Sequence, residues 1–214
     1  MSNENKIVGG ICLAFFIVIA YLFWMGPSLD QSTQIKNPDL LVKDNSHMTG
    51  KKGAKVTMVE FGDYQCPACA TVNPDIKKIV ETYKDNPDFN FVFRNFPLSQ
   101  HKNAIPAAEA AESAGAQGKY FEMGTQLYEN QREWSELDDA MPMFKKYAIA
   151  IGLEMVQFDS DMTQHKFASV IQADAVDGNG LFVDHTPTVY LNGLEIRDLN
   201  FPVIKAKIDE LLAK

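Results

Sequence analysis

The sequence of 214 residues predicts an α/β fold, in which a small α/β core carries an all-helical insertion and follows an N-terminal transmembrane helix. Three observations predict this arrangement. A charge-free apolar segment lies near the start, helical patterns fill the middle of the chain, and strand-like runs occur on both sides of that middle part. The length suffices for one domain with a substantial core.

The apolar segment is residues 7–25, IVGGICLAFFIVIAYLFWM. As a helix it is long enough to cross ~30 Å of hydrocarbon. Tyr21 and Trp24 lie at its far end, where such amphipathic rings favour the membrane interface. A cleaved signal peptide is the alternative, but such peptides end in small residues, whereas this segment ends in bulky ones. We therefore expect a retained anchor.

The anchor divides the rest of the chain. Residues 1–6 are predicted to be a short cytoplasmic tail, residues 26–48 a linker, and residues 49–214 one domain with a helical insertion at about 104–178. A short head before a single span, with the whole domain after it, favours an amino terminus inside the cell. We therefore expect a single-pass protein of the cell membrane with an extracytoplasmic domain, periplasmic or on the outer surface.

The charge of the chain argues against one class of partner. Its formal net charge is -8, and its lysines are scattered among acidic residues. Binding to nucleic acid requires grouped positive charge. The sequence therefore predicts no nucleic-acid partner, and because no segment resembles a dimerisation module, we expect a monomer.

The domain is predicted to open with a strand, a helix and a second strand. Residues 56–61 form a β-rich run typical of a buried strand. Apolar residues then recur at helical spacing from residue 66 to about 86, with Pro74 expected to kink the helix. Residues 89–94 alternate in part and predict the second strand. This order places a pair of cysteines at the amino end of the first helix.

The insertion is predicted to be entirely helical. Ser135 and Asp138 resemble a capping pair that opens a helix running toward Gly152, and Pro142 is expected to kink or interrupt that helix. The expected helical segments are residues 104–116, 120–128, 135–152 and 163–177.

Strand signals return near the end of the chain. Residues 188–191 and 194–196 flank Asn192-Gly193, a pair favoured in two-residue hairpin turns. A closing helix is expected from Asn200, with Pro202 in its first turn. The last part of the domain is therefore predicted to be a hairpin followed by a helix.

Cys66 and Cys69 are the chemically informative residues. At the amino end of a helix, unpaired backbone N–H groups and the helix dipole stabilise a thiolate and lower the pKa of the thiol. The pattern predicts a reactive thiolate at Cys66 and, one turn further, a less exposed partner at Cys69. Because Cys12 falls in the predicted membrane segment, these two cysteines can pair only with each other or with another molecule.

Two other interpretations of the cysteine pair stay open at this point. A zinc or iron–sulfur site usually needs four cysteine or histidine ligands, and no two of the four histidines are closely spaced. A structural disulfide closing so short a loop would restrain little of the unfolded chain. Neither interpretation explains the position of the pair at a helix end as well as redox chemistry does.

Several segments together resemble the DsbA-like thiol–disulfide oxidoreductases of the thioredoxin superfamily. The matching segments are Val59-Glu60-Phe61, Cys66-Pro67-Ala68-Cys69, residues 93–98, the helix at residues 107–117, and Thr186-Pro187-Thr188 followed by Asn192-Gly193. The resemblance extends from about residue 46 to the end of the chain. It implies a thioredoxin-like fold with a helical insertion, and an enzyme whose redox-active disulfide requires no other cofactor.

The resemblance also implies three further site residues. Glu60 matches a buried acid that could transfer the proton of Cys69. Pro187 matches a cis-proline that lies against the cysteine pair and exposes the backbone of Thr186 to a substrate strand. The alternatives are a solvated strand-end carboxylate for Glu60 and an ordinary turn proline for Pro187.

The leading functional hypothesis is a membrane-tethered oxidase that introduces disulfides into exported cysteine-containing proteins. The resemblance implies recharging by a membrane quinone-linked thiol oxidoreductase. Pro67-Ala68 supplies no histidine to stabilise the thiolate, so the reduction potential stays open between ~-270 and ~-120 mV. A reductase or isomerase is therefore an alternative, and a non-enzymatic anchored domain that binds or delivers metal is another.

Overall fold

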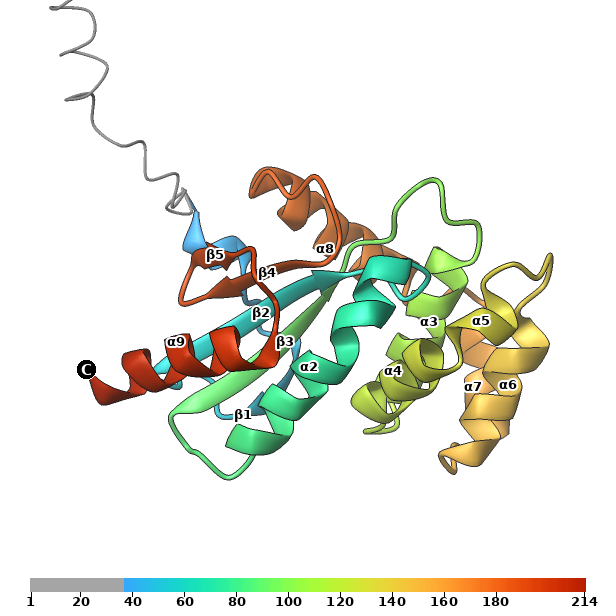
Figure 1. Cartoon of the computed structure of the whole chain (residues 1–214). Coiled ribbons are helices and arrows are strands. Elements are labelled where there is room, and N and C mark those ends of the chain that lie inside the picture. Colours follow the sequence, from blue (N-terminus) through green and yellow to red (C-terminus); the bar gives the residue numbers. More distant parts are fainter. Residues whose placement is uncertain (1–36) are drawn as a thin grey trace, which may run out of the picture. The chain divides into compact units, whose positions relative to one another are not determined.

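The computed structural model describes residues 37–214 (Figure 1). The predicted tail, the predicted transmembrane helix and residues 26–36 of the predicted linker lie outside this range. Among residues 37–214, no helix is both long and apolar enough to span a bilayer. The elements are, in order, η1 Pro38–Leu40, β1 His47–Gly50, β2 Val56–Gly62, α2 Pro67–Tyr83, β3 Phe89–Asn95, α3 Ala104–Gly115, α4 Tyr120–Glu129, α5 Gln131–Trp134, α6 Met141–Ala150, α7 Met155–Thr163, α8 Ala168–Gly180, β4 Thr188–Leu191, β5 Leu194–Ile196 and α9 Phe201–Ala213.

The core is a five-stranded mixed sheet with the order β1-β3-β2-β4-β5. β2 and β3 run parallel and are joined by α2, whereas the other neighbouring strands are antiparallel. The predicted β4–β5 hairpin is present, and both of its turn residues, Asn192 and Gly193, have positive φ angles of 46° and 86°. Mirror-image turns of this kind match the twist of the paired strands.

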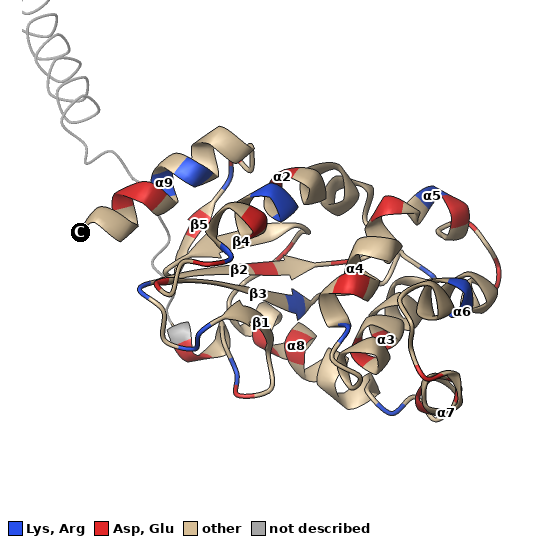
Figure 2. Cartoon of the chain, turned by 90° about the horizontal axis from the view of Figure 1, so that it is seen from below, with Lys and Arg blue, Asp and Glu red and all other residues tan. Residues whose placement is uncertain are grey.

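Helices cover both faces of the sheet. Figure 2 shows α2 and α9 on one side of the sheet and α8 on the other. Successive residues of β2 point to opposite faces, so that Met58 packs in the core formed with α2 and α9. Val59 and Phe61 pack with Leu41 and Val183 on the α8 side. The carboxyl end of β2 leads through residues 63–66 to the start of α2.

The insertion between β3 and β4 is helical, as the sequence predicts (Figure 1). The alanine-rich α3 lies at its centre, with all of its alanines buried. Small side chains allow neighbouring helices to approach closely. Trp134 is fully buried and meets the ring of Phe144 edge-on, at 5.3 Å between centroids. The core of the inserted helices is continuous with the core between the sheet and α2 and α9.

The expected helix at 135–152 starts later than predicted. The short α5 ends at Trp134, and α6 begins only at Met141. Pro142 lies in the first turn of α6, where its missing N–H is not needed. The proline therefore starts this helix rather than interrupting it, and Ser135 does not open it.

The expected helix at 163–177 was also wrong in its bounds. The segment contains the end of α7 and most of α8, separated by a turn in which His165 has a positive φ of 48°. Glu154 caps α7 by accepting hydrogen bonds from the N–H groups of Val156 and Gln157. Glutamate is uncommon as a cap, so the sequence carried little sign of this helix start.

The domain begins earlier than the predicted boundary at residue 49. Leu41 is buried, and β1 pairs with β3 from His47 onward. The fully buried Arg94 also holds this region, because its guanidinium donates hydrogen bonds to the carbonyl oxygens of Leu40 and Leu41 at 2.7 and 3.0 Å. The last third of the predicted linker is therefore part of the fold.

Arg94 is balanced by two acidic residues of α8. Its Nε lies 2.8 Å from Asp174 Oδ1, and its Nη2 lies 2.6 Å from Asp177 Oδ2. A buried cation needs partners of this kind, because removing one of them leaves an uncompensated charge. These ion pairs connect α8 to β3 of the sheet.

Charged residues elsewhere are interspersed. Figure 2 shows both basic and acidic positions on α2 and on α9. Several of them form exposed ion pairs, such as Lys205 with Asp209 at 2.6 Å. Such pairs contribute little to stability. Within the described residues, this distribution agrees with the scattered lysines of the sequence.

Candidate functional site

The two cysteines lie at the junction of β2 and α2. Cys66 is the residue just before the helix, with extended backbone angles (φ -69°, ψ 121°), and Pro67 occupies the first turn as predicted. The backbone of Cys66 is fixed on both sides, because its N–H donates to the carbonyl of Asp63 and its carbonyl accepts from the N–H of Ala70. Both cysteines are free thiols in the structure. Cys66 is 6% exposed and Cys69 is fully buried.

The surroundings of Cys66 favour its ionised form. A hydrogen bond from the Cys69 thiol is the largest cause that lowers the pKa of Cys66, to about 5. The Thr186 side chain and the backbone N–H groups of Cys69 and Ala68 lower this pKa further, and burial acts in the opposite direction. The sequence predicted only the contribution of the helix end. The neighbouring thiol contributes more than the backbone groups.

The pKa values of Cys69 and Glu60 are raised, whereas that of Cys66 is lowered. Burial raises the pKa of Cys69 well above its ordinary value, and Cys66 and Glu60 raise it further. Burial also raises the pKa of Glu60 to about 8. Glu60 is 3% exposed, so the alternative of a solvated strand-end carboxylate is wrong. The site therefore combines an acidic thiol, a weakly acidic thiol and a carboxyl group that keeps its proton at neutral pH.

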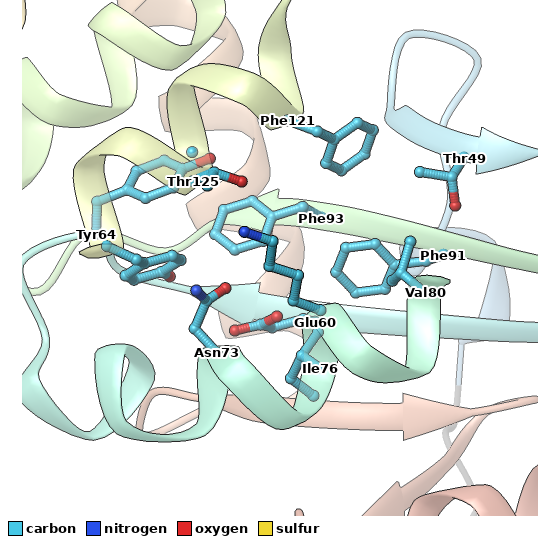
Figure 3. Close-up of a pocket in the computed structure, with 13 residues that line it drawn as sticks. Thr49, Glu60, Tyr64, Asn73, Ile76, Val80, Phe91, Phe93, Phe121 and Thr125 are labelled. Carbon is cyan, nitrogen blue, oxygen red and sulfur yellow. The ribbon is translucent and has the colours of Figure 1, made fainter. Parts of the chain in front are cut away.

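A cavity of about 110 Å³ reaches Glu60 from the side of α2 and α4. Figure 3 shows the Glu60 carboxylate beside Asn73 and Ile76, with the rings of Tyr64 and Phe93 across the cavity. Glu60 Oε1 is buried and has no hydrogen-bond partner among the described residues. A space of this size can hold water, and unpaired buried oxygens favour it. Glu60 thus has an approach from solvent separate from the cysteines.

The bond between Thr186 and Pro187 is cis, which agrees with the implied cis-proline. The loop before β4 brings this bond to the cysteine pair. In its thiol form, Cys66 donates a hydrogen bond of 3.4 Å from Sγ to the carbonyl oxygen of Thr186. Thr186 is buried. The structure therefore brings all five predicted site residues, Cys66, Cys69, Glu60, Thr186 and Pro187, into one region.

Sequence analysis missed Asp63, a polar residue that holds the loop before Cys66. The side chain of Asp63 is completely buried, and it accepts hydrogen bonds from the N–H groups of Gln65 and Leu98 at 2.7 and 2.9 Å. The same carboxylate lies 2.6 Å from His101 Nδ1. The short spacing of Asp63 from Cys66 could have signalled a role, but its partners Leu98 and His101 are 35 and 38 residues away along the chain.

No cluster of three or more histidine, cysteine or acidic side chains is placed to hold a metal ion in the part of the chain that the structure describes. Three histidines instead contact single buried carboxylates. His47 lies 2.8 Å from Glu112, and His165 lies 3.0 Å from Glu109.

Comparison with known proteins shows which family the chain belongs to. The family described as Thioredoxin (Thioredoxin_4) matches residues 43–210. The Na(+)/H(+) antiporter NhaA 1 of Mycobacterium sp. (strain KMS) is 35% identical over 175 residues, which cover 79% of this chain but only 27% of the antiporter. This chain therefore spans about a quarter of the length of that relative. The probable disulfide bond formation protein D of Bacillus cereus (strain ATCC 14579) is 28% identical, with 100% of this chain and 99% of that protein covered.

Solved structures agree with this placement. Oxidised BdbD from Bacillus subtilis has a TM-score of 0.70 and 27% identity, with 79% of this chain and 94% of that chain covered. α-DsbA1 from Wolbachia pipientis has a TM-score of 0.70 at 22% identity, with 80% and 93% covered, and so shows likeness of fold alone. The chain therefore belongs to the thioredoxin family, and its described domain is of the DsbA-like type with helices inserted between β3 and β4.

Proposed function

We propose that this protein is a thiol–disulfide oxidoreductase that acts as an oxidase, introducing disulfides into exported proteins through the Cys66–Cys69 pair. The observation that carries this proposal is the contrast between two neighbouring thiols. The pKa of Cys66 is lowered to about 5, whereas that of Cys69 is raised. Such a contrast gives the two sulfurs of one disulfide different roles.

The first step begins from the oxidised pair. A client thiolate attacks Cys66 Sγ, a bond forms between the two sulfurs, and the Cys66–Cys69 bond breaks. Cys69 leaves as a thiolate. Because burial disfavours that charge, it takes up a proton, and the protonated carboxyl of Glu60 supplies it. The Glu60 cavity then allows solvent to restore the proton to Glu60.

The second step releases the product. A second thiolate of the client attacks the client sulfur of the mixed disulfide, and Cys66 leaves as a stabilised thiolate. The client has gained one disulfide, and Cys66 and Cys69 have gained the two electrons as a dithiol. Thr186 and Pro187 flank Cys66, and we assign them the binding of the client backbone by strand addition.

The direction follows from the acidity of the leaving sulfur. A thiolate that is stabilised in the reduced protein makes the corresponding disulfide a stronger oxidant. The thiolate pKa is ~7 in thioredoxin and ~3.5 in DsbA, and the value of about 5 for Cys66 lies between them. The full-length likeness to a protein named for disulfide bond formation also supports the oxidase direction.

The proposed cellular setting rests on the sequence. Residues 7–25 anchor the chain in the cell membrane, and residues 37–214 lie outside the cytoplasm as a monomer. An exported, oxidising location keeps disulfides stable. A membrane quinone-linked thiol oxidoreductase removes the electrons from the Cys66–Cys69 dithiol.

The reduction potential tests the oxidase direction. The protein is equilibrated with glutathione buffers of known ratio, and the reduced fraction of the Cys66–Cys69 pair is measured after acid quenching and thiol labelling. We expect a potential closer to ~-120 mV than to the ~-270 mV of thioredoxin. A Cys69→Ser variant, which cannot form the disulfide, gives the labelling baseline. A potential near that of thioredoxin would favour the reductase alternative instead.

A further inference from the structure

The active-site loop is tied to the inserted helices by buried amide side chains. The loop, residues 63–66, connects β2 to α2, and the inserted residues that contact it lie just before α3, in α5 and just after α5. α5 has only four residues and follows α4 directly.

Gln131, the first residue of α5, makes the central contact. Its side-chain nitrogen donates one hydrogen bond to the carbonyl of Tyr64 at 2.8 Å and one to the carbonyl of Cys66 at 3.0 Å. Both hydrogens of the amide are therefore used on the loop. Gln131 is only 8% exposed. In a buried setting these bonds are costly to lose, because the carbonyl groups would be left with fewer partners.

A second amide pair holds the loop from the neighbouring residue. Gln65 donates from Nε2 to the carbonyl of Ser135 at 2.6 Å, and its Oε1 accepts from the N–H of Asn103 at 2.6 Å. Asn103 in turn donates to the carbonyl of Leu137 at 2.8 Å. The loop is thus fixed to the insertion at three successive residues, 64, 65 and 66.

The position of Cys66 matters because its stabilising contacts are short-range. The groups that favour its thiolate are the Cys69 thiol, Thr186 and the first N–H groups of α2. Hydrogen bonds weaken steeply with changes in distance and angle. A small rotation of Cys66 about its own backbone would move Sγ away from all of these donors at once. The carbonyl of Cys66 that Gln131 holds also accepts the N–H of Ala70.

We propose that Gln131 is a positioning residue for thiol–disulfide exchange, whose amide holds Cys66 in the orientation in which its sulfur is attacked and released. This inference deepens the proposed function and rests on it. It also gives the insertion a role, because one of its side chains holds the backbone of the residue that carries the reacting sulfur. Gln131 touches neither the client nor Sγ in this proposal.

The test compares Gln131→Met with Gln126→Met. Methionine has nearly the shape of glutamine but donates no hydrogen bond, and Gln126 lies on α4 with its contacts to Asn130, away from the loop. The reduced proteins are alkylated with iodoacetamide over a range of pH, and the modified Cys66 peptide is quantified. For Gln131→Met we expect the midpoint to rise by about one pH unit, so that the rate at pH 4 falls about tenfold. Gln126→Met should behave like the wild type.

The outcome separates positioning from simple packing. Thermal unfolding checks that each variant is folded, and Gln131→Asn provides a second variant, which keeps an amide but places it one methylene further from the loop. An unchanged midpoint in folded Gln131→Met and Gln131→Asn overturns the inference. Because alkylation requires no client, a shifted midpoint without protein oxidation by the wild type would support the positioning role and overturn only the proposed function.

Discussion

Replacing Cys66 by serine should reduce disulfide transfer to a reduced client by at least ~1,000-fold. A serine hydroxyl is not ionised at neutral pH and cannot carry the disulfide, so no residual route through the site is left. Cys69→Ser should differ in kind. The Cys66 thiolate can still attack a client disulfide, so that a mixed disulfide forms and the other client sulfur leaves as a thiolate, but the Cys69 thiol that would resolve this intermediate is gone.

Non-reducing electrophoresis of the membrane fraction, followed by mass spectrometry of the bands, distinguishes these variants. We expect client adducts with Cys69→Ser and none with Cys66→Ser. Cys12→Ser is the matched control, because Cys12 lies in the predicted anchor, and both assays should resemble the wild type. Adducts that persist in Cys66→Ser would show that another cysteine attacks first.

Replacing Glu60 by glutamine should slow exchange and stabilise the fold at neutral pH. In the unfolded chain this carboxyl ionises near its ordinary value of 4.5, whereas burial keeps it protonated in the folded protein up to about pH 8. Between these values the unfolded state binds fewer protons, so the free energy of unfolding falls by about 1.4 kcal/mol per pH unit. Glutamine removes this loss because it does not ionise.

Urea unfolding at pH 5 and at pH 7.5 measures the effect. The stability difference between Glu60→Gln and the wild type should grow between these two pH values, while turnover at pH 7.5 falls about tenfold or more, as expected when a general acid is removed. Glu136→Gln, at an exposed carboxyl, should change neither quantity. Wild-type turnover in folded Glu60→Gln would end the proposed proton role.

The elements around the cysteines could be predicted because their signals are local. The strand at 56–62, the start of α2 at Pro67 and the Asn192-Gly193 turn each follow from adjacent residues. β1 could not be predicted in the same way. Its four residues, HMTG, have little strand character, and they form a strand because β3 offers them an unpaired edge.

At the site, too, sequence analysis fails where a role depends on contacts between residues that are far apart along the chain. The cysteines, Glu60 and Pro187 are recognisable by spacing and resemblance. Gln131 is not, because an isolated glutamine gains its role only when α5 is packed against the loop, 65 residues from its partner Cys66 along the chain. The dominant effect of the Cys69 thiol on the pKa of Cys66 likewise depends on the geometry of the folded turn.

The pH dependence of Cys66 alkylation in the reduced wild-type protein tests the central claim most directly. Peptide mapping separates Cys66 from the fully buried Cys69. The ionised sulfur is the reactive species, so the rate should reach half of its maximum near pH 5 and stay level through neutral pH. A midpoint near 9, the ordinary value for a cysteine, would contradict a stabilised thiolate at the start of α2 and with it the proposed chemistry.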